Sequence, residues 1–190
     1  MMVDMTSQSA PSSIPLGARV VLMRHGETEW ARTGKHTGRT EVPLTPLGEM
    51  QATATGNRLR TLDLRNPMIL TSPRLRAQLT GDLAGLPEER TWDALSEWDY
   101  GDYEGLTTPE IRATVPDWTV WTHPCPGGEQ ADQIHARTDM VLSMVRSQLP
   151  ERDVILIGHG HFSRALIARW LELPVTEGKR FALSPGAYSV

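Results

Sequence analysis

Two short apolar runs, each ending in a histidine and a glycine, dominate the hydrophobic pattern of the chain. Residues 20–26 read Val-Val-Leu-Met-Arg-His-Gly, and residues 154–160 read Val-Ile-Leu-Ile-Gly-His-Gly. Apolar runs of this length without polar alternation are typical of strands that are buried on both faces of a parallel sheet. Ligands of such sheets bind at the carboxyl ends of the strands. We therefore expect His25 and His159 to lie over one site if the two strands are neighbours.

Segments with helical periodicity separate these strands and predict an α/β fold. Thr45 and Pro46 are a typical helix start, as cap and first-turn proline, and Ser72-Pro73 begins another helix. The predicted helices are 45–62, 72–83, a short one from Thr108, 133–149 and 162–171, and the further predicted strands are 67–71 and 187–190. Residues 29–43 have little apolar periodicity and are predicted to form a loop over the carboxyl end of the first strand.

Length and composition favour one soluble domain. The chain has 190 residues and is 39% hydrophobic, enough for a single core in residues 18–190, while residues 1–17, rich in Ser, Pro and Gln, predict a flexible tail. A net charge of −4 argues against a general nucleic-acid binder. No stretch approaches the ~20 apolar residues of a membrane span. The lone Cys125 fits a reducing compartment, so we expect a cytoplasmic location.

The polar residues near the strand ends suggest phosphoryl transfer. The loop after the first strand is basic, and the segment 95–105 places carboxylates among aromatic rings, where an acid could donate a proton. Arg74 and Arg76 lie at a predicted helix start, where a bound anion would explain them, although surface arginines are equally common. A neutral imidazole is a good nucleophile for phosphorus if arginines and a second imidazole neutralise the transferring oxygens.

Together these motifs resemble the histidine phosphatase superfamily, the phosphoglycerate-mutase-like proteins. The matching segments are 24–28 (Arg-His-Gly-Glu-Thr), 43–48, 72–77, 95–97, 103–105, 126–129, and 159–161 with Arg164. The resemblance implies a three-layer α/β/α sandwich on a mainly parallel sheet, and chemistry that needs no metal or organic cofactor. It also implies the following roles: His25 is the phosphorylated nucleophile, Arg24, Arg76 and His159 hold the phosphoryl group, Glu97 donates the proton, and Thr37, Gly38 and Tyr100 contact substrate.

Within this family the residues of the motifs favour a phosphatase. Residues 97–105 and 37–40 are similar to a bacterial acid-phosphatase branch and to the fungal sedoheptulose bisphosphatases. Ala31 and His161 stand where the mutase pattern has asparagines, and the region between Glu97 and His159 is short for a mutase. We therefore predict a phosphomonoesterase that acts on small phosphorylated metabolites and could form a homodimer. The alternatives are a 2,3-bisphosphoglycerate-dependent mutase, a sugar bisphosphatase, a metal site at the histidines, and a non-catalytic phosphoprotein-binding module.

Overall fold

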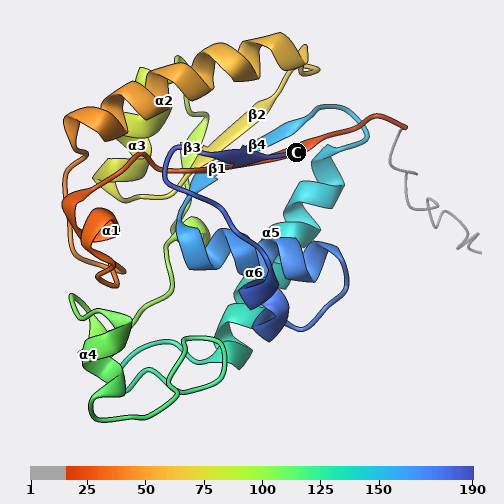
Figure 1. Cartoon of the computed structure of the whole chain (residues 1–190). Helices are drawn as coiled ribbons and strands as arrows, with labels where there is room; N and C mark the ends of the chain where they lie inside the picture. Colours follow the sequence, from red (N-terminus) through yellow and green to blue (C-terminus); the bar gives the residue numbers. More distant parts are fainter. Residues whose placement is uncertain (1–15) are drawn as a thin grey trace, which may run out of the picture.

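Five strands form one sheet in the order β3-β2-β4-β1-β5 (Figure 1). The computed structural model describes residues 16–190, so most of the predicted tail, residues 1–15, lies outside the described residues. The strands are β1 (Val20–Arg24), β2 (Met68–Thr71), β3 (Arg90–Thr91), β4 (Val154–Gly158) and β5 (Tyr188–Ser189). All neighbouring strands are parallel except β5, which runs antiparallel to β1. The mainly parallel sheet is therefore confirmed.

Helices cover both faces of the sheet and complete a three-layer α/β/α sandwich (Figure 1). One layer holds α2 (Pro46–Leu59) and α3 (Leu75–Leu83), and the other holds α5 (Ala131–Gln148) and α6 (Gly160–Trp170). The shorter helices are α1 (Glu29–Thr33), α4 (Thr108–Arg112), η1 (Arg60–Leu62), η2 (Asp93–Leu95), η3 (Gly101–Tyr103) and η4 (Val175–Arg180).

Side-chain alternation along β1 explains the two hydrophobic layers. Val21 and Met23 pack with Leu59 and Ala77 of the α2–α3 layer, whereas Leu22 belongs to the larger cluster on the α5–α6 face. Successive side chains of a strand point to opposite faces, so a strand covered on both sides has to be apolar at every position. This is why the central strands lack polar alternation.

The segment after β1 differs from the prediction. Residues 29–43 were predicted to be a loop, but Glu29–Thr33 form α1. The Thr28 hydroxyl caps this helix by accepting a hydrogen bond from Ala31 N at 3.1 Å. A helix of five residues is too short to show apolar periodicity, so the sequence pattern could not reveal it. Among residues 16–190, no helix is both long and apolar enough to cross a membrane.

The register of the two central strands positions the predicted site. β1 and β4 are parallel neighbours, and Arg24 is the partner of Gly158 in the ladder. The next residues along each strand, His25 and His159, therefore leave the sheet at the same level. Their ring centroids lie 5.2 Å apart, which confirms that the repeated pattern brings the two histidines together.

Candidate active site

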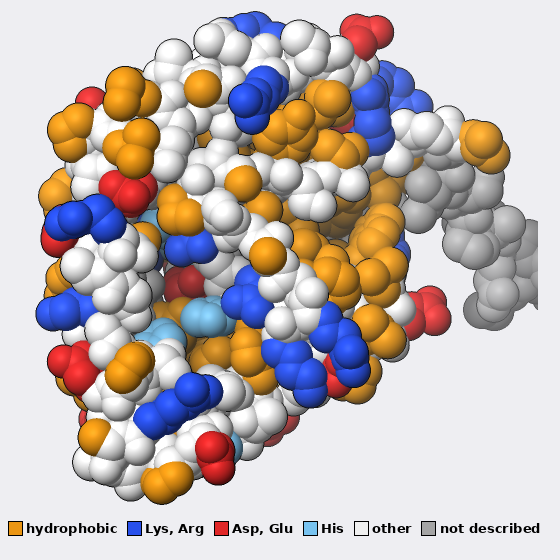
Figure 2. All heavy atoms as spheres, viewed as in Figure 1, with side chains coloured by type: hydrophobic (Ala, Val, Ile, Leu, Met, Phe, Trp, Pro, Cys, Tyr) orange, Lys and Arg blue, Asp and Glu red, His pale blue; other side chains and the backbone are white. Residues whose placement is uncertain are grey.

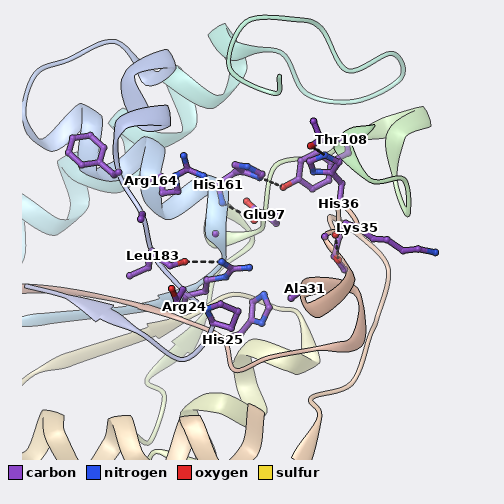
Figure 3. Close-up of a pocket in the computed structure, with 18 residues that line it drawn as sticks. Arg24, His25, Ala31, Lys35, His36, Glu97, Thr108, His161, Arg164 and Leu183 are labelled. Carbon is purple, nitrogen blue, oxygen red and sulfur yellow. Dashed lines mark hydrogen bonds between the residues drawn. The ribbon is translucent and has the colours of Figure 1, made fainter. Parts of the chain in front are cut away.

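A cavity of about 490 Å³ opens where the carboxyl ends of β1 and β4 meet (Figure 3). In Figure 2 it is the hollow in which histidine side chains are visible. Residues from the segments 31–37, 97–108, 160–164 and 181–185 line it together with the end of β1. The lining includes the predicted site residues Arg24, His25, Thr37, Glu97 and Tyr100, but not Gly38, Arg76 or His159.

His25 is held as a neutral imidazole with one free nitrogen. Its Nδ1 lies 2.7 Å from the carbonyl oxygen of Gly26, and a carbonyl can only accept, so Nδ1 carries the proton. Burial lowers the pKa of His25 well below its usual range, and Arg24 and Arg76 lower it further. Nε2 is consequently left with a lone pair, as a nucleophile requires.

His159 is fully buried beside it and is fixed by a hydroxyl group. Its Nε2 lies 2.7 Å from Ser72 Oγ, and with this hydroxyl as donor the ring proton is on Nδ1. Nδ1 is buried and has no hydrogen-bond partner among residues 16–190. Burial, followed by the charge of Arg76, lowers the pKa of His159 well below its usual range. An unpaired buried N–H is costly, and this nitrogen is a donor without an acceptor among the described residues.

Arg24 also lines the cavity. Its Nη1 donates to the carbonyl of Leu183 at 2.8 Å, whereas its buried Nε has no partner among residues 16–190. The guanidinium packs on the first residue of α6: a Cβ on Gly160 would lie 3.1 Å from Arg24 Cζ. The absence of a side chain at Gly160 therefore lets the arginine reach the cavity.

Arg76 has a different environment. It is only 1% exposed, and its Nη atoms donate to the carbonyls of Thr37, Gly38 and Thr40 at 2.9 to 3.1 Å. The guanidinium therefore secures the loop 37–40, and its charge still acts on the pKa of both His25 and His159.

Two glutamates that the sequence placed close together have separate environments. Glu97 lines the cavity: its Oε1 accepts from Trp98 N and Phe162 N at 2.9 and 2.8 Å, and its Oε2 accepts from His161 N at 3.0 Å. Glu104 instead accepts from the backbone N–H of Gly38 and Thr40.

These hydrogen bonds assign the two carboxylates different tasks. Backbone amides at the start of α6 donate to the Glu97 carboxylate and orient it at the cavity. Its Oε2 accepts fewer backbone hydrogen bonds than Oε1. Glu104 shapes the loop by accepting from the amide of Gly38, a residue to which the resemblance assigned substrate contact.

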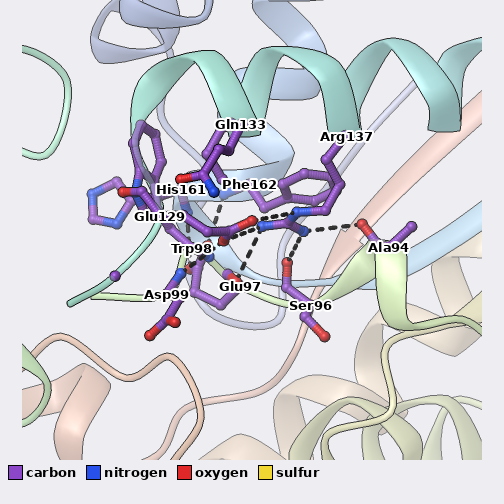
Figure 4. A network of polar contacts seen from close by, with 12 residues as sticks. Ala94, Ser96, Glu97, Trp98, Asp99, Glu129, Gln133, Arg137, His161 and Phe162 are labelled. Carbon is purple, nitrogen blue, oxygen red and sulfur yellow. Dashed lines mark hydrogen bonds and ion pairs between the residues drawn. The ribbon is translucent and has the colours of Figure 1, made fainter. Parts of the chain in front are cut away.

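A polar network holds the backbone segment that carries Glu97 (Figure 4). Arg137 of α5 donates from Nη1 to the carbonyls of Ala94 and Ser96 at 3.0 and 2.6 Å. The same guanidinium pairs with Glu129 at 2.7 Å and lies 4.0 Å from the ring centroid of Phe162. Glu129 belongs to the Pro-Gly-Gly-Glu segment, whose role the sequence alone did not explain.

The wall opposite His25 consists of aromatic and imidazole rings (Figure 3). Tyr100 Oη lies 2.6 Å from His161 Nδ1, and the ring of His36 lies 4.7 Å from that of Tyr100, centroid to centroid. His36 Nε2 lies 3.3 Å from Thr108 Oγ1. Burial lowers the pKa of both histidines and raises the pKa of Tyr100 well above its usual range, which favours the neutral form of all three rings.

Comparison with known proteins decides the family. The family profile described as histidine phosphatase superfamily (branch 1) matches residues 20–190. The chain belongs to the histidine phosphatase superfamily. An acid phosphatase of Mycobacterium tuberculosis is 48% identical over 172 residues, which are 90% of this chain and 85% of that protein. Sedoheptulose 1,7-bisphosphatase of Saccharomyces cerevisiae is 37% identical over 194 residues, with 87% and 70% covered.

Solved structures agree with this histidine phosphatase fold. A structure from Mycobacterium tuberculosis superposes with a TM-score of 0.90 at 48% identity, covering 90% of this chain and 89% of the other. A mycobacterial glucosyl-3-phosphoglycerate phosphatase superposes with a TM-score of 0.75 at 30% identity, covering 90% and 88%. The family and these relatives identify the chain as a phosphatase, in agreement with the prediction from its motifs.

Some lining residues of this histidine phosphatase had not been predicted as site residues. His36 had appeared only within a basic loop expected to contact an anion, and His161 only as a departure from the family pattern and in the metal-site alternative; the segment 181–185 had not appeared at all. The signal for the histidines was their position next to predicted site residues; residues 181–185 carry no polar motif. In residues 16–190, no group of three or more His, Cys, Asp or Glu side chains is placed to hold a metal ion, so the metal-site alternative gains no support.

Proposed function

We propose that this histidine phosphatase hydrolyses small phosphomonoesters, as an acid phosphatase does, through a phosphohistidine at His25. The observation that carries the proposal is the free Nε2 of a neutral imidazole, buried beside His159 and Arg24 in a cavity that Glu97 also lines. The 48% identity to an acid phosphatase supports the same reaction class.

The first chemical step transfers the phosphoryl group to the enzyme. The lone pair of His25 Nε2 forms the N–P bond while the P–O bond of the ester breaks, and the protonated carboxyl of Glu97 gives its proton to the leaving oxygen. Oε2 is the oxygen suited to carry that proton because it accepts one backbone N–H where Oε1 accepts two. Arg24, Arg76 and His159 stabilise the charge on the transferring oxygens.

The second step returns the enzyme to its starting state. The Glu97 carboxylate takes a proton from water, the water oxygen forms the new P–O bond, and the N–P bond breaks. Inorganic phosphate leaves, and His25 is again neutral with its proton on Nδ1. We assign substrate contacts to Thr37 and Tyr100, which line the cavity, and to Gly38 through the loop it belongs to.

The setting of the reaction follows from charge and composition. Membership of the phosphatase family supports a small phosphorylated substrate, and a net charge of −4 argues against nucleic acid as a partner. A single cysteine, buried and free, supports a cytoplasmic location. Homodimer formation stays a prediction.

The decisive experiment is to trap the phosphoenzyme. Brief mixing with labelled phenyl phosphate, followed by denaturation, should leave one phosphoryl group that is labile to acid and stable to alkali, as a phosphoramidate is. His25→Ala should abolish the label, whereas His159→Ala should slow its formation and keep the acceptor. A label that persists in His25→Ala, or no label in any variant, contradicts the proposal.

One further measurement separates hydrolysis from mutase activity. The mutase alternative requires the phosphohistidine to survive until a second substrate accepts the phosphoryl group. We expect the enzyme to release inorganic phosphate without any requirement for 2,3-bisphosphoglycerate. Isomerisation of phosphoglycerate that depends on this bisphosphate would show a mutase instead.

A further inference from the structure

The cavity extends well beyond the phosphoryl site, and its far wall carries hydrogen-bonding rings. In Figure 3, Glu97 lies between His25 on one side and His161 with His36 on the other. A phosphate ester with its phosphorus at His25 and its ester oxygen at Glu97 therefore directs its leaving group toward the wall formed by His36 and His161. This placement rests on the proposed function.

The hydrogen bond between Tyr100 and His161 determines what this wall presents. Tyr100 keeps its proton, and His161 Nδ1, at 2.6 Å, is its partner among residues 16–190. With the phenol as donor, Nδ1 is the acceptor and the ring proton of His161 must be on Nε2. Since His161 lines the cavity, this N–H is a donor for whatever occupies it.

His36 adds a second ring with its own fixed partner. Its Nε2 is 3.3 Å from the Thr108 hydroxyl, and the opposite edge of the imidazole retains Nδ1 for a further hydrogen bond. The ring is held between Tyr100, at 4.7 Å, and Trp118, at 5.2 Å between centroids. Both imidazoles are thus rigid hydrogen-bonding groups rather than mobile surface side chains.

The charged groups at this end are engaged elsewhere. Lys35 Nζ lies over the ring of Trp30, 5.6 Å from its centroid. Arg164 donates from Nε and Nη2 to the carbonyls of Gly178 and Lys179 and stacks on Trp121 at 4.8 Å. A leaving group at this wall consequently meets neutral donors and acceptors, with one arginine edge at the margin.

We propose that His36 and His161 form a leaving-group subsite that binds hydroxyl groups, so that the preferred substrates are monophosphates of polyols or sugars. Neutral imidazoles pair well with hydroxyls, which both donate and accept. An alkyl leaving group without hydroxyls leaves the second nitrogen of each ring without a partner, and a site built for hydrogen bonds discriminates against such an analogue.

The test compares two leaving groups of the same carbon number. Glycerol 3-phosphate carries two hydroxyls on its three-carbon chain and n-propyl phosphate carries none. The native enzyme should show a kcat/KM at least ~10-fold higher for glycerol 3-phosphate, the size expected for one or two net hydrogen bonds. His161→Phe should remove most of this preference through KM, and His36→Phe should reduce it as well. Turnover of n-propyl phosphate should fall much less than that of glycerol 3-phosphate in both variants.

Controls keep folding and chemistry apart from recognition. His135→Phe changes a half-exposed histidine on α5, paired with Asp139 and distant from the cavity, and should leave the preference intact. Hydrolysis of n-propyl phosphate needs the acid catalyst, so its retention shows that Glu97, which is bonded to His161 N, has kept its place.

Three outcomes overturn the subsite. The first is a native enzyme that treats both esters alike, and the second is a His161→Phe variant that loses both activities equally. The third is a strong preference for fructose 1,6-bisphosphate over fructose 6-phosphate that disappears in Arg164→Gln, since a second anion would then be the recognised group. Any of these with the phosphohistidine label intact refutes the subsite alone, whereas loss of the label refutes the proposed function.

Discussion

Arg137 and Glu129 form a two-bond ion pair, with Nε 2.9 Å from Oε1 and Nη2 2.7 Å from Oε2. The pair connects α5 to the segment that carries the candidate acid, because Arg137 Nη1 donates to the carbonyl of Ser96 and Glu129 Oε2 accepts from Asp99 N. The backbone is therefore held both before and after Glu97, at Ser96 and at Asp99. The pair is suited to position Glu97, and it gives a role to the Pro-Gly-Gly-Glu segment.

We predict that Arg137→Met impairs proton donation more than phosphoryl transfer. Without the guanidinium, the carbonyls of the 94–97 segment lose their donors and Glu97 loses its fixed position. Hydrolysis of alkyl phosphates should fall ~10-fold or more, while esters of acidic phenols, which leave without a proton, should be less affected. The measurement is kcat/KM for both ester types.

The control for Arg137 is a comparable ion pair far from the site. Arg169 pairs with Asp139 at 2.8 Å between α6 and α5, so Arg169→Met should leave the ratio of alkyl to aryl activity unchanged. In the Glu97→Gln background, Arg137→Met should reduce alkyl-phosphate hydrolysis little further, because the carboxyl group that Arg137 positions is already absent. Equal loss on both ester types would indicate a general structural role instead.

We predict that Glu97, and not Glu104, is the proton donor. Glu97→Gln should strongly reduce turnover of alkyl phosphates and spare esters of acidic phenols, with an alkyl loss of ~10² to 10⁴. Glu104→Gln removes an acceptor for the Gly38 and Thr40 amides, so it should affect both esters alike by disturbing the loop. The reverse pattern in these two variants would exchange the assignments.

The sequence predicted the central strands and the two histidines that follow them because both depend on short-range patterns. An unbroken apolar run is the direct consequence of burial on two faces, and β1 and β4 were found on that basis. Adjacency of the two strands was not visible in the chain, since pairing is a tertiary choice. The repeated His-Gly ending suggested that the two strands are neighbours, and only the structure could show it.

The parts of the site that sequence reasoning missed depend on contacts between distant segments. Leu183 belongs to the site because its backbone carbonyl accepts a hydrogen bond from Arg24. Every residue has such a carbonyl, so the amino-acid sequence does not indicate which one is used. The His36–Tyr100–His161 wall likewise joins residues from three separate loops and helices. Arg76 was predicted to face the phosphoryl group, and its loop-holding bonds could not be foreseen from its position at a helix start.

We predict that Arg76→Ala lowers kcat far more than Arg74→Ala. Arg76 is buried, and its charge reaches both histidines, whereas the Arg74 side chain is 27% exposed and paired with Glu41 at the surface. Loss of one preorganised cation from the transition state should cost ~10² to 10³ in rate, against only a few-fold at Arg74. Arg76→Lys, which keeps the charge but not the three carbonyl contacts, should recover part of the rate. Similar losses for the two alanine variants would refute this assignment.

The final prediction concerns the acid limb of the pH profile. Burial is the first reason that the pKa of His25 lies well below its usual range, and the charge of Arg24 is the second. The neutral imidazole of His25 is the proposed nucleophile, so the rate of phosphoenzyme formation should persist as the pH falls below the ordinary histidine pKa. It should decline only when the pH passes through the lowered value. This behaviour suits an acid phosphatase.

Arg24→Gln tests that cause directly. Removing one positive charge makes the imidazolium less costly, so the pKa of His25 should rise and the acid limb of phosphoenzyme formation should move to higher pH. The maximal rate should fall as well, because we assign Arg24 a second role in stabilising the transferring phosphoryl group. Single-turnover labelling with phenyl phosphate from about pH 4 to about pH 7 separates the two effects, since only the first moves the midpoint. Arg169→Gln serves as the control with an unchanged midpoint, and a midpoint that stays fixed in Arg24→Gln would show that burial alone keeps His25 neutral.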